Sequence, residues 1–466
     1  MKIKNIIISL CGFVMSMSAF AQTSVTVTHP HFSRPSQKTI IKERPGYLRT
    51  TITCSNTTEA ATFIYANDGM QASERTIEGI FVNDMVVEKD SVYFCGKHHS
   101  TGNGIVGYFK ISELFSESGV AQIDTVLRAG EEGYRMGEMT RLVVFKDPMA
   151  MRHIISIGKT KAGGYPCIVD YMLGLNSPVY CGGYVDNRNE EFTDLKTVYN
   201  SQNDPYLVTV GYETSNGRFL NVRVHDLLQF ISSSVKDWQH LFCVDTGYVN
   251  EWLDGGVLLA ATGTNSFATV SHRDYGYNGT GIIKVGHNLH LGFFNLDDII
   301  SHSVYGMTDN YEIPITLSAS RTMNEFIYNT KKKHLVFLHT YTADLTGIVK
   351  NEYCEVDPAL LSASGSLQAY TNPDNMFYGL SVFWIMGKYI LSGYRSSNPE
   401  TLKYQMNTFA TTSHCAEPVI YKYNQKKVLS SRNTINAIKY KLNQADPIVF
   451  ECIVEELPLY IECETE

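Results

Sequence analysis

The sequence predicts an all-β protein made of one repeated unit of four strands, and two observations lead to this prediction. The first is the segment VNDMVVEKDSVYFCGKHHSTGNGIVGYFKISELF, residues 82–115, which reads as three strands and a short helical turn. A fourth extended piece follows at residues 123–127. The third strand of this unit recurs along the chain after further glycines, namely Gly164, Gly217, Gly281 and Gly347.

The second observation is a carboxylate just before or within the apolar run that opens each unit. These acids are Asp84, Glu138, Asp194, Glu251, Glu325 and Asp374, at intervals of 54, 56, 57, 74 and 49 residues. The intervals indicate six units, at about 80–130, 137–185, 193–245, 247–317, 323–370 and 374–424. A further 62 residues lead to Asn436, which opens a similar segment. A sandwich does not produce such a period, so the repeats predict a β-propeller with seven blades, or six as the alternative.

The two ends of the chain are predicted to complete this ring. The C-terminal segment offers only three strands, at residues 435–442, 448–454 and 459–463. The segment ATFIYA, residues 61–66, has no repeat of its own around it. If this N-terminal strand joins the last blade, the ring closes and no sheet edge stays exposed. A single propeller domain is therefore expected over residues 46–466.

The N-terminal residues predict export. Residues 1–21 carry Lys2 and Lys4, then an apolar run that ends in Ala19-Phe20-Ala21, which is typical of a secretory signal peptide. Residues 22–45 are polar, contain three prolines and are expected to form an extended arm. No later segment approaches the length of a membrane-spanning helix, so no transmembrane segment is expected. The mature protein is predicted to be periplasmic or extracellular.

Charge and cysteine content narrow the possible partners and chemistry. The chain has a net charge of −8, and removal of the signal leaves 37 basic against 47 acidic residues. Such an acidic chain is not expected to bind nucleic acid, which favours basic surfaces. The cysteines show no CxxC or metal-type spacing. Cys95 and Cys354 lie in predicted strands and are expected to be buried thiols.

The chain resembles exported β-propeller-like proteins of unassigned function from gut Bacteroidetes. The resemblance is carried by the signal ending SAFAQ, the arm HPHFSRPSQKTI, and the blade motif VNDMVVEKDSVYFCG followed by GIVGYFKISELF. It covers essentially the whole chain. It implies the fold and export, and it brings no activity with it.

The six repeated acids are the first candidate ligand-binding residues. The first strand of each propeller blade lines the central channel, so these carboxylates are expected near a common axis. Together they could hold a cation such as Ca²⁺ or a cationic ligand group; no other cofactor is expected. Alternatively, each acid accepts hydrogen bonds from backbone N–H groups of the adjoining blade. The second interpretation is favoured, because a feature present in every repeat more often serves the repeat itself.

An insertion in the fourth unit, Thr264 to Thr280, supplies the second set of candidates. It places His272, Tyr275, Tyr277 and Asn278 among glycines. Aromatic faces pack on sugar rings and amides bind hydroxyls, so these four residues are predicted to bind a ligand. The alternative is a surface loop without a ligand.

Other motifs carry less information. His98, His99, His287 and His290 would form a metal site only if the fold brought them together with His272, because no metal-type spacing links them. The match to GxGxxG at Gly102 to Gly107 lies between two strands and is expected to be a hairpin turn.

The sequence contains no signature of nucleophilic catalysis. The main prediction is a non-catalytic exported propeller that binds a glycan or protein ligand through loops at one face. The first alternative is a glycoside hydrolase or lyase-type enzyme that uses carboxylates at the channel mouth. The second alternative is a structural or assembly component.

Overall fold

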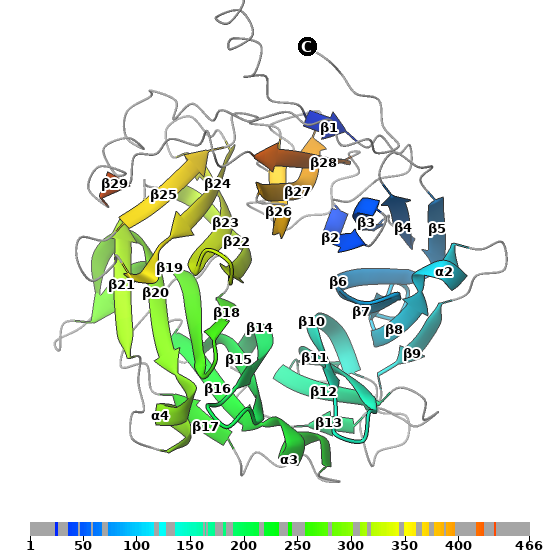
Figure 1. Cartoon of the computed structure of the whole chain (residues 1–466), viewed down its shortest axis with the longest axis horizontal. Helices are drawn as coiled ribbons and strands as arrows, with labels where there is room; N and C mark the ends of the chain where they lie inside the picture. Colours follow the sequence, from blue (N-terminus) through cyan, green and yellow to red (C-terminus); the bar gives the residue numbers. More distant parts are fainter. Residues whose placement is uncertain are drawn as a thin grey trace, which may run out of the picture.

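The computed structural model of the chain describes residues 24–26, 36–44, 47–56, 59–67, 73–115, 121–126, 136–161, 164, 166–172, 180–182, 190–213, 219–232, 241–244, 257–277, 282–301, 308–314, 318–343, 349–359, 366–371, 377–385, 388–396, 416–423 and 433–434. Within these residues the strands form seven sheets, and Figure 1 shows the sheets arranged in a ring around a central axis. In each sheet the consecutive strands pair antiparallel. The fold is therefore all-β and of the propeller type, which confirms the predicted class.

The first two sheets consist of β2 (Ser36–Arg44), β3 (Tyr47–Asn56), β4 (Ala60–Asn67) and β5 (Ser73–Glu78), then β6 (Ile80–Glu88), β7 (Ser91–His98), β8 (Gly104–Lys110) and β9 (Gln122–Thr125). The next two consist of β10 (Met136–Lys146), β11 (Arg152–Thr160), β12 (Pro166–Met172) and β13 (Tyr180–Gly182), then β14 (Glu190–Tyr199), β15 (Pro205–Glu213), β16 (Phe219–Asp226) and β17 (Leu241–Val244).

The remaining sheets begin with β18 (Leu258–Gly263), β19 (Ser266–Tyr277), β20 (Ile282–Asn295) and β21 (Asp309–Pro314). They continue with β22 (Ser318–Asn329), β23 (His334–Ala343), β24 (Val349–Val356), β25 (Ser366–Thr371) and β29 (Asn433–Thr434), and end with β26 (Phe377–Ile385), β27 (Lys388–Ser396), β28 (Ala416–Tyr423) and β1 (Ser24–Thr26). Three short helices follow third strands, α2 (Ile111–Leu114), α3 (Leu227–Ser232) and α4 (Leu296–Ile300). None of the described helices is long and apolar enough to cross a membrane.

The six predicted units are confirmed as sheets, but the predictions for the N-terminal region need correction. Residues 36–44 of the predicted arm form β2, which pairs with β3. Residues 61–66, expected in the last blade, lie in β4 between β3 and β5. The physical reason is a local core, because Ile52, Cys54 and Phe63 pack against the neighbouring β6–β9 sheet. The predicted strands at 435–463 and the signal peptide lie outside the described residues.

The first strands of the sheets lie nearest the central axis in Figure 1, as expected for a propeller. A β-bulge interrupts several of them near their start, for example between Val82 and Asp84 and between Phe192 and Asp194. A bulge bends the strand and redirects the next side chain. On β15 the residue opposite Phe192 is Gly211, where a Cβ atom would lie 1.7 Å from the Glu191 carbonyl oxygen. The close approach of the bulged strand therefore requires glycine.

Apolar cores fill the spaces between adjacent sheets. Phe63 of β4 meets Phe109 of β8 edge-on, with ring centroids 4.9 Å apart. Cys95 and Cys354 belong to such cores and are buried, as predicted. Gly102 adopts a φ of +67° and its N–H donates to the His98 carbonyl, so the GxGxxG match is the predicted hairpin turn.

Candidate functional site

Two of the predicted channel acids join neighbouring sheets. The Asp84 carboxylate accepts a hydrogen bond of 3.1 Å from the Leu142 backbone N–H of the next sheet. The Asp194 carboxylate accepts one of 2.9 Å from the Leu259 N–H, again across a sheet boundary. Both acids are buried. Both acids therefore accept backbone hydrogen bonds from the adjoining sheet, as the favoured interpretation of the repeated acids expected.

The residue within each of these bulges adds a second bond across the same boundary. Asn83 donates through Nδ2 to the Met139 carbonyl at 2.7 Å. The Thr193 hydroxyl donates to the Val257 carbonyl at 2.6 Å and accepts from the Val257 N–H at 3.1 Å. The bulge and the acid after it thus act together to hold adjacent inner strands in register.

The other predicted channel acids do not share one environment. Glu138 lies within the first of two register irregularities of β10, between Met136 and Met139, and accepts 2.8 Å bonds from Asn83 and Lys97. Arg141 follows the second irregularity. Glu325 follows the bulge of β22. Burial lowers the pKa of Arg141, but attraction to Asp84, Asp194 and Glu325 outweighs it and raises that pKa. Glu251 and Asp374 lie outside the described residues.

The predicted insertion is a strand extension. Residues 266–277 and 282–295 pair as the long hairpin β19–β20, with Tyr275 opposite Lys284 and Tyr277 opposite Ile282. His272 is buried, and its Nε2 lies 3.4 Å from Nδ1 of His339 on β23. The expectation of a ligand-binding loop histidine is thus wrong for His272, because strand pairing turns its side chain into the core between two sheets. Asn278 lies outside the described residues.

The histidines considered for a metal site are dispersed. His290 is buried, but it pairs with Ser271 and so lies on the opposite face of the β18–β21 sheet from His272, whereas His98 contacts Thr125 at 3.1 Å in a different sheet. Across the described part of the chain, no group of three or more His, Cys, Asp or Glu residues is arranged to hold a metal ion.

A pocket of about 620 Å³ lies between the β18–β21 sheet and the β22–β25 sheet, and we call it the interblade pocket. Its volume falls within the range of small-molecule sites. It is lined by Thr262, Ser266, Phe267, Phe293, Phe294, Asn295, Thr308, Tyr328, Lys332, Lys333, Asp357, Pro358 and Ala359. The lining thus combines aromatic rings, two ammonium groups and one carboxylate.

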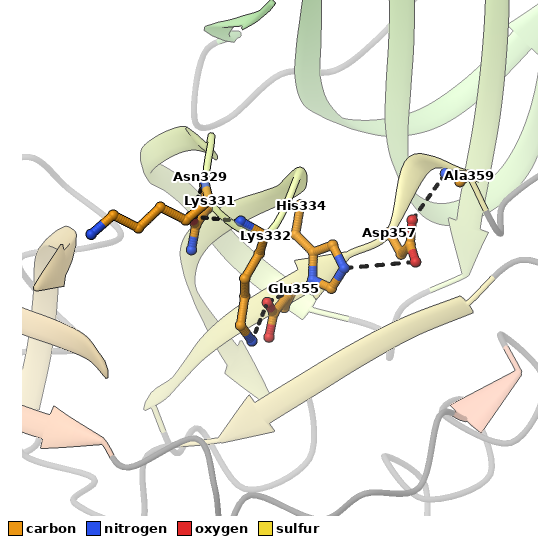
Figure 2. A network of polar contacts seen from close by, with 7 residues as sticks. All are labelled: Asn329, Lys331, Lys332, His334, Glu355, Asp357 and Ala359. Atoms are coloured by element: carbon orange, nitrogen blue, oxygen red, sulfur yellow. Dashed lines mark hydrogen bonds and ion pairs between the residues drawn. The ribbon is translucent and has the colours of Figure 1, made fainter. Parts of the chain in front are cut away.

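A polar network supports the charged side of this pocket (Figure 2). His334 Nδ1 lies 2.7 Å from the Glu355 carboxylate, and its Nε2 lies 3.6 Å from that of Asp357. Lys332 reaches the same Glu355 oxygen at 3.1 Å. Asp357 also accepts a 3.1 Å bond from the Ala359 N–H. Asp357 is thereby held at the pocket wall.

Two pKa shifts bear on the chemistry of the network. Burial raises the pKa of Glu355, but the bonds from His334 and Lys332 and their charges outweigh it, so the pKa is lowered. Glu355 is therefore an anion that holds its two partners in place. Burial raises the pKa of Tyr328. The Tyr328 hydroxyl thus keeps its proton at neutral pH and can donate a hydrogen bond.

The turn between β22 and β23 presents the lysines in a defined geometry. The buried Asn329 side chain accepts bonds from the N–H groups of Lys331 at 3.1 Å and Lys332 at 3.2 Å. The Lys333 N–H donates to the Asn329 carbonyl at 2.7 Å. The backbone from which Lys332 and Lys333 enter the pocket is therefore ordered by three hydrogen bonds.

The same histidine–carboxylate pair occurs in a second sheet. On β11 and β12, His153 Nδ1 lies 2.9 Å from Asp170, and both side chains are buried. The strand register is the same in both sheets. Asp170 pairs with Ile155, two residues after His153, and Glu355 pairs with Val336, two residues after His334. The pair is therefore a repeated structural device, and the copy in the β22–β25 sheet lies beside the interblade pocket.

Sequence reasoning missed the interblade pocket. The available signal was the run Lys331-Lys332-Lys333 in a hairpin turn of an acidic chain, followed by Asp357 at the end of the third strand of the same unit. The backbone of the predicted residues Tyr275 and Tyr277 lies in the adjoining sheet, in the β19–β20 hairpin.

The pocket residues can perform acid–base chemistry on a sugar. The rings of Phe293 and Tyr328 offer aromatic faces to a sugar ring. Asp357 is a carboxylate that can accept a proton, and Tyr328 can donate one. Both side chains line the same cavity as Lys332 and Lys333.

Comparison with known proteins finds likeness to solved structures alone, since no protein-family model and no curated protein sequence matches the chain. The polysaccharide lyase Uly1 is 7% identical with a TM-score of 0.45, over 85% of this chain and 91% of that one. The GH93 α-L-arabinofuranosidase of Fusarium graminearum is 11% identical with a TM-score of 0.38, over 71% and 89%. The β-propeller domain of the Trilobed protease from Pyrococcus furiosus is 8% identical with a TM-score of 0.38, over 80% and 91%. Against a prolyl endopeptidase, this chain spans 51% of the other protein's length.

These findings correct the main functional prediction. A non-catalytic propeller was expected, whereas the similar structures include a lyase and a glycoside hydrolase. That expectation is therefore not retained. At these identities and TM-scores the likeness establishes no activity for this chain, and any activity must rest on the residues of the pocket.

Proposed function

We propose that the protein is an enzyme that cleaves a polysaccharide, by hydrolysis or by elimination, and that the reaction takes place in the interblade pocket. The observation that carries this proposal is that Asp357 and Tyr328 line one cavity together with the aromatic ring of Phe293. A proton acceptor, a proton donor and a sugar-packing face are thus within the same 620 Å³.

The roles follow from the surroundings of each group. Asp357 accepts a proton, either from a water molecule that attacks the anomeric carbon or from a sugar carbon next to a carboxylate. Tyr328 donates its proton to the leaving glycosidic oxygen. In hydrolysis, water supplies the new C–O bond; in elimination, the C–H electron pair forms a C=C bond as the C–O bond breaks. Neither reaction requires a further reactant.

The pocket supports catalysis better than the central channel does. At the channel, Asp84 and Asp194 each use a carboxylate oxygen to bond the next sheet. Moving either acid toward a substrate would break a contact between inner strands. Asp357, by contrast, lies at the wall of a cavity large enough for a sugar unit.

The test is a screen of polysaccharides for new reducing ends and for the ultraviolet absorbance of an unsaturated product. With a substrate in hand, Asp357→Asn and Tyr328→Phe should each lower kcat/KM by about 100-fold or more. The control is Glu78→Gln, because Glu78 is exposed on β5 of another sheet and should leave the rate unchanged. Cleavage that persists in both pocket variants, or a wild-type protein that cleaves none of the polysaccharides, would contradict the proposal.

We also infer that the seven sheets are the blades of one closed ring. In support, β1 pairs with β28 in the register Ser24 to Tyr421, so an N-terminal strand contributes to the last sheet. The inner strand β2 of the first sheet contacts both β6 and β26. Export to the periplasm or the exterior, as the first residues predict, would bring such an enzyme to polysaccharides.

A further inference from the structure

We infer that the substrate of the interblade pocket is an acidic saccharide, whose carboxylate or sulfate group binds beside Lys332 and Lys333. The inference rests on the proposed function and names its substrate class. It is drawn from the charges around the pocket, from the order of the lysine turn and from a comparison with the equivalent turn of another sheet.

The first step is the arrangement of charge at the pocket. The pocket wall carries Lys332, Lys333 and Asp357, and the network beneath it carries Glu355. Glu355 holds Lys332 at 3.1 Å, and the Asp357 carboxylate lies 3.6 Å from His334 Nε2. Lys333 is exposed at the pocket wall. A bound anion there would pair with its ammonium group.

The second step is that the lysines are positioned before any ligand arrives. Asn329 fixes the N–H groups of Lys331 and Lys332, and the Lys333 N–H is bonded to the Asn329 carbonyl. An ordered backbone lowers the entropy that binding would otherwise lose. In Figure 2, Lys332 points into the network while Lys331 extends away from it.

The third step is that the histidine–carboxylate pair does not itself need the lysines. The pair of His153 and Asp170 has the same strand register. The equivalent turn lies between Phe145 and His153 and contains Asp147, whose carboxylate lies 3.6 Å from His153 Nε2, together with Lys146 and Arg152. Arg152 reaches Glu88 of the preceding sheet at 3.6 Å, whereas Lys332 and Lys333 line the pocket. The two turns therefore differ in where their basic side chains lie, and only the lysines of the second turn are placed at the interblade pocket.

The experiment measures the affinity of two matched pairs of oligosaccharides by titration calorimetry. One pair is an oligogalacturonide and its methyl ester, and the other is a dextran sulfate oligosaccharide and dextran of equal length. We expect at least one acidic member to bind about tenfold more tightly than its neutral partner. Its affinity should fall as salt is added. Tighter binding of the oligogalacturonide than of the dextran sulfate would assign a carboxylate ligand, and the reverse would assign a sulfate. Equal affinity for these two acidic compounds would assign a general anion site.

Two substitutions in the same turn locate the binding. Lys333→Gln should weaken binding of the acidic member about tenfold, whereas Lys331→Gln should change it less than about twofold. Both lysines are exposed, so neither change should unfold the protein. Equal binding of acidic and neutral members, no binding by any of them, or an unchanged affinity in Lys333→Gln would overturn the inference.

The two proposals fail in different ways. If the protein cleaves a neutral polysaccharide with no dependence on Lys333, the acidic substrate is wrong and the enzyme proposal stands. If acidic oligosaccharides bind through Lys333 and the wild-type protein cleaves no polysaccharide, the enzyme proposal is wrong and the charge of the ligand stands.

Discussion

The Asp194 carboxylate accepts a hydrogen bond of 2.9 Å from the backbone N–H of Leu259 and so connects β14 to β18 across a sheet boundary. Asp194 is buried, and its second oxygen lies 2.9 Å from its neighbour's N–H, that of Leu195. Asp84 makes the corresponding bond to Leu142 two sheet boundaries earlier in the chain, between β6 and β10. The stability of the ring thus depends on side chains as well as on the apolar cores between sheets.

Replacing Asp194 should therefore destabilise the whole protein. Asp194→Ala leaves the Leu259 N–H without its carboxylate partner in a buried place, which we expect to cost about 2 kcal/mol in the free energy of unfolding. Urea denaturation followed by circular dichroism measures the change. Glu78→Ala, on the exposed edge of another sheet, is the control and should alter the free energy by less than about 0.5 kcal/mol. A midpoint for Asp194→Ala equal to that of the control would refute the role of the carboxylate.

Gly211 should tolerate no side chain. A Cβ atom at this position would lie 1.7 Å from the Glu191 carbonyl oxygen, so Gly211→Ala must displace the bulged strand. The expected loss is at least about 2 kcal/mol. At Gly263 the nearest atom to such a Cβ is the Ser266 hydroxyl oxygen, 3.5 Å away, and Gly263→Ala should therefore be close to neutral. Similar melting temperatures for the two variants would show that the bulge is not a rigid feature.

Glu355 should make stability depend on pH in the acid range. Its pKa is lowered in the folded protein, so it contributes stability that is present above its unfolded value of about 4.5 and is lost as the pH falls through the folded value. Glu355→Gln should cost about 2 kcal/mol at neutral pH and flatten the acid limb of the stability curve. The measurement is the urea midpoint from neutral pH into the acid range. An acid limb as steep in the variant as in the wild type would count against the His334–Glu355 contact.

His153 should produce the opposite dependence. Burial lowers the pKa of His153, but the hydrogen bond and charge of Asp170, together with those of Asp147, outweigh burial. The pKa of His153 is therefore raised above its usual value of 6.5. Stability from this pair is complete below 6.5 and is lost as the pH rises through the folded value. Asp170→Asn should cost about 3 kcal/mol in mildly acid solution and less in alkaline solution. Nuclear magnetic resonance titration of His153 checks the direction, and a pKa below 6.5 would disprove it.

The repeat could be located from the sequence because strand patterns are local. The alternation in VNDMVVEKDSVYFCG and the regular intervals between the opening acids placed six units, and the structure confirms them as sheets. The first sheet was missed because β2 lies in a polar segment between Pro35 and Pro45, whereas β3 and β4, with which it forms a sheet, follow that segment.

The candidate site depends on contacts between units. Residues that are far apart in sequence form no local pattern, so these contacts could not be predicted from the sequence. Whether Asp84 faces a ligand or the Leu142 N–H is decided by a bulge that places the next sheet beside it. His272 appeared to lie in a polar loop, yet the long β19–β20 hairpin buries it against His339.

The chain's local chemistry determined the strand content, the period of the repeat and the turns, because these follow from residues near one another in sequence. Only the packing of one sheet on the next decided the contacts between sheets, such as the bond from the Leu259 N–H to Asp194. The interblade pocket joins Phe293 to Lys333 and Asp357 from two successive sheets. A pocket of this kind exists only when separate units are brought together, and for that reason tertiary structure was needed to find it.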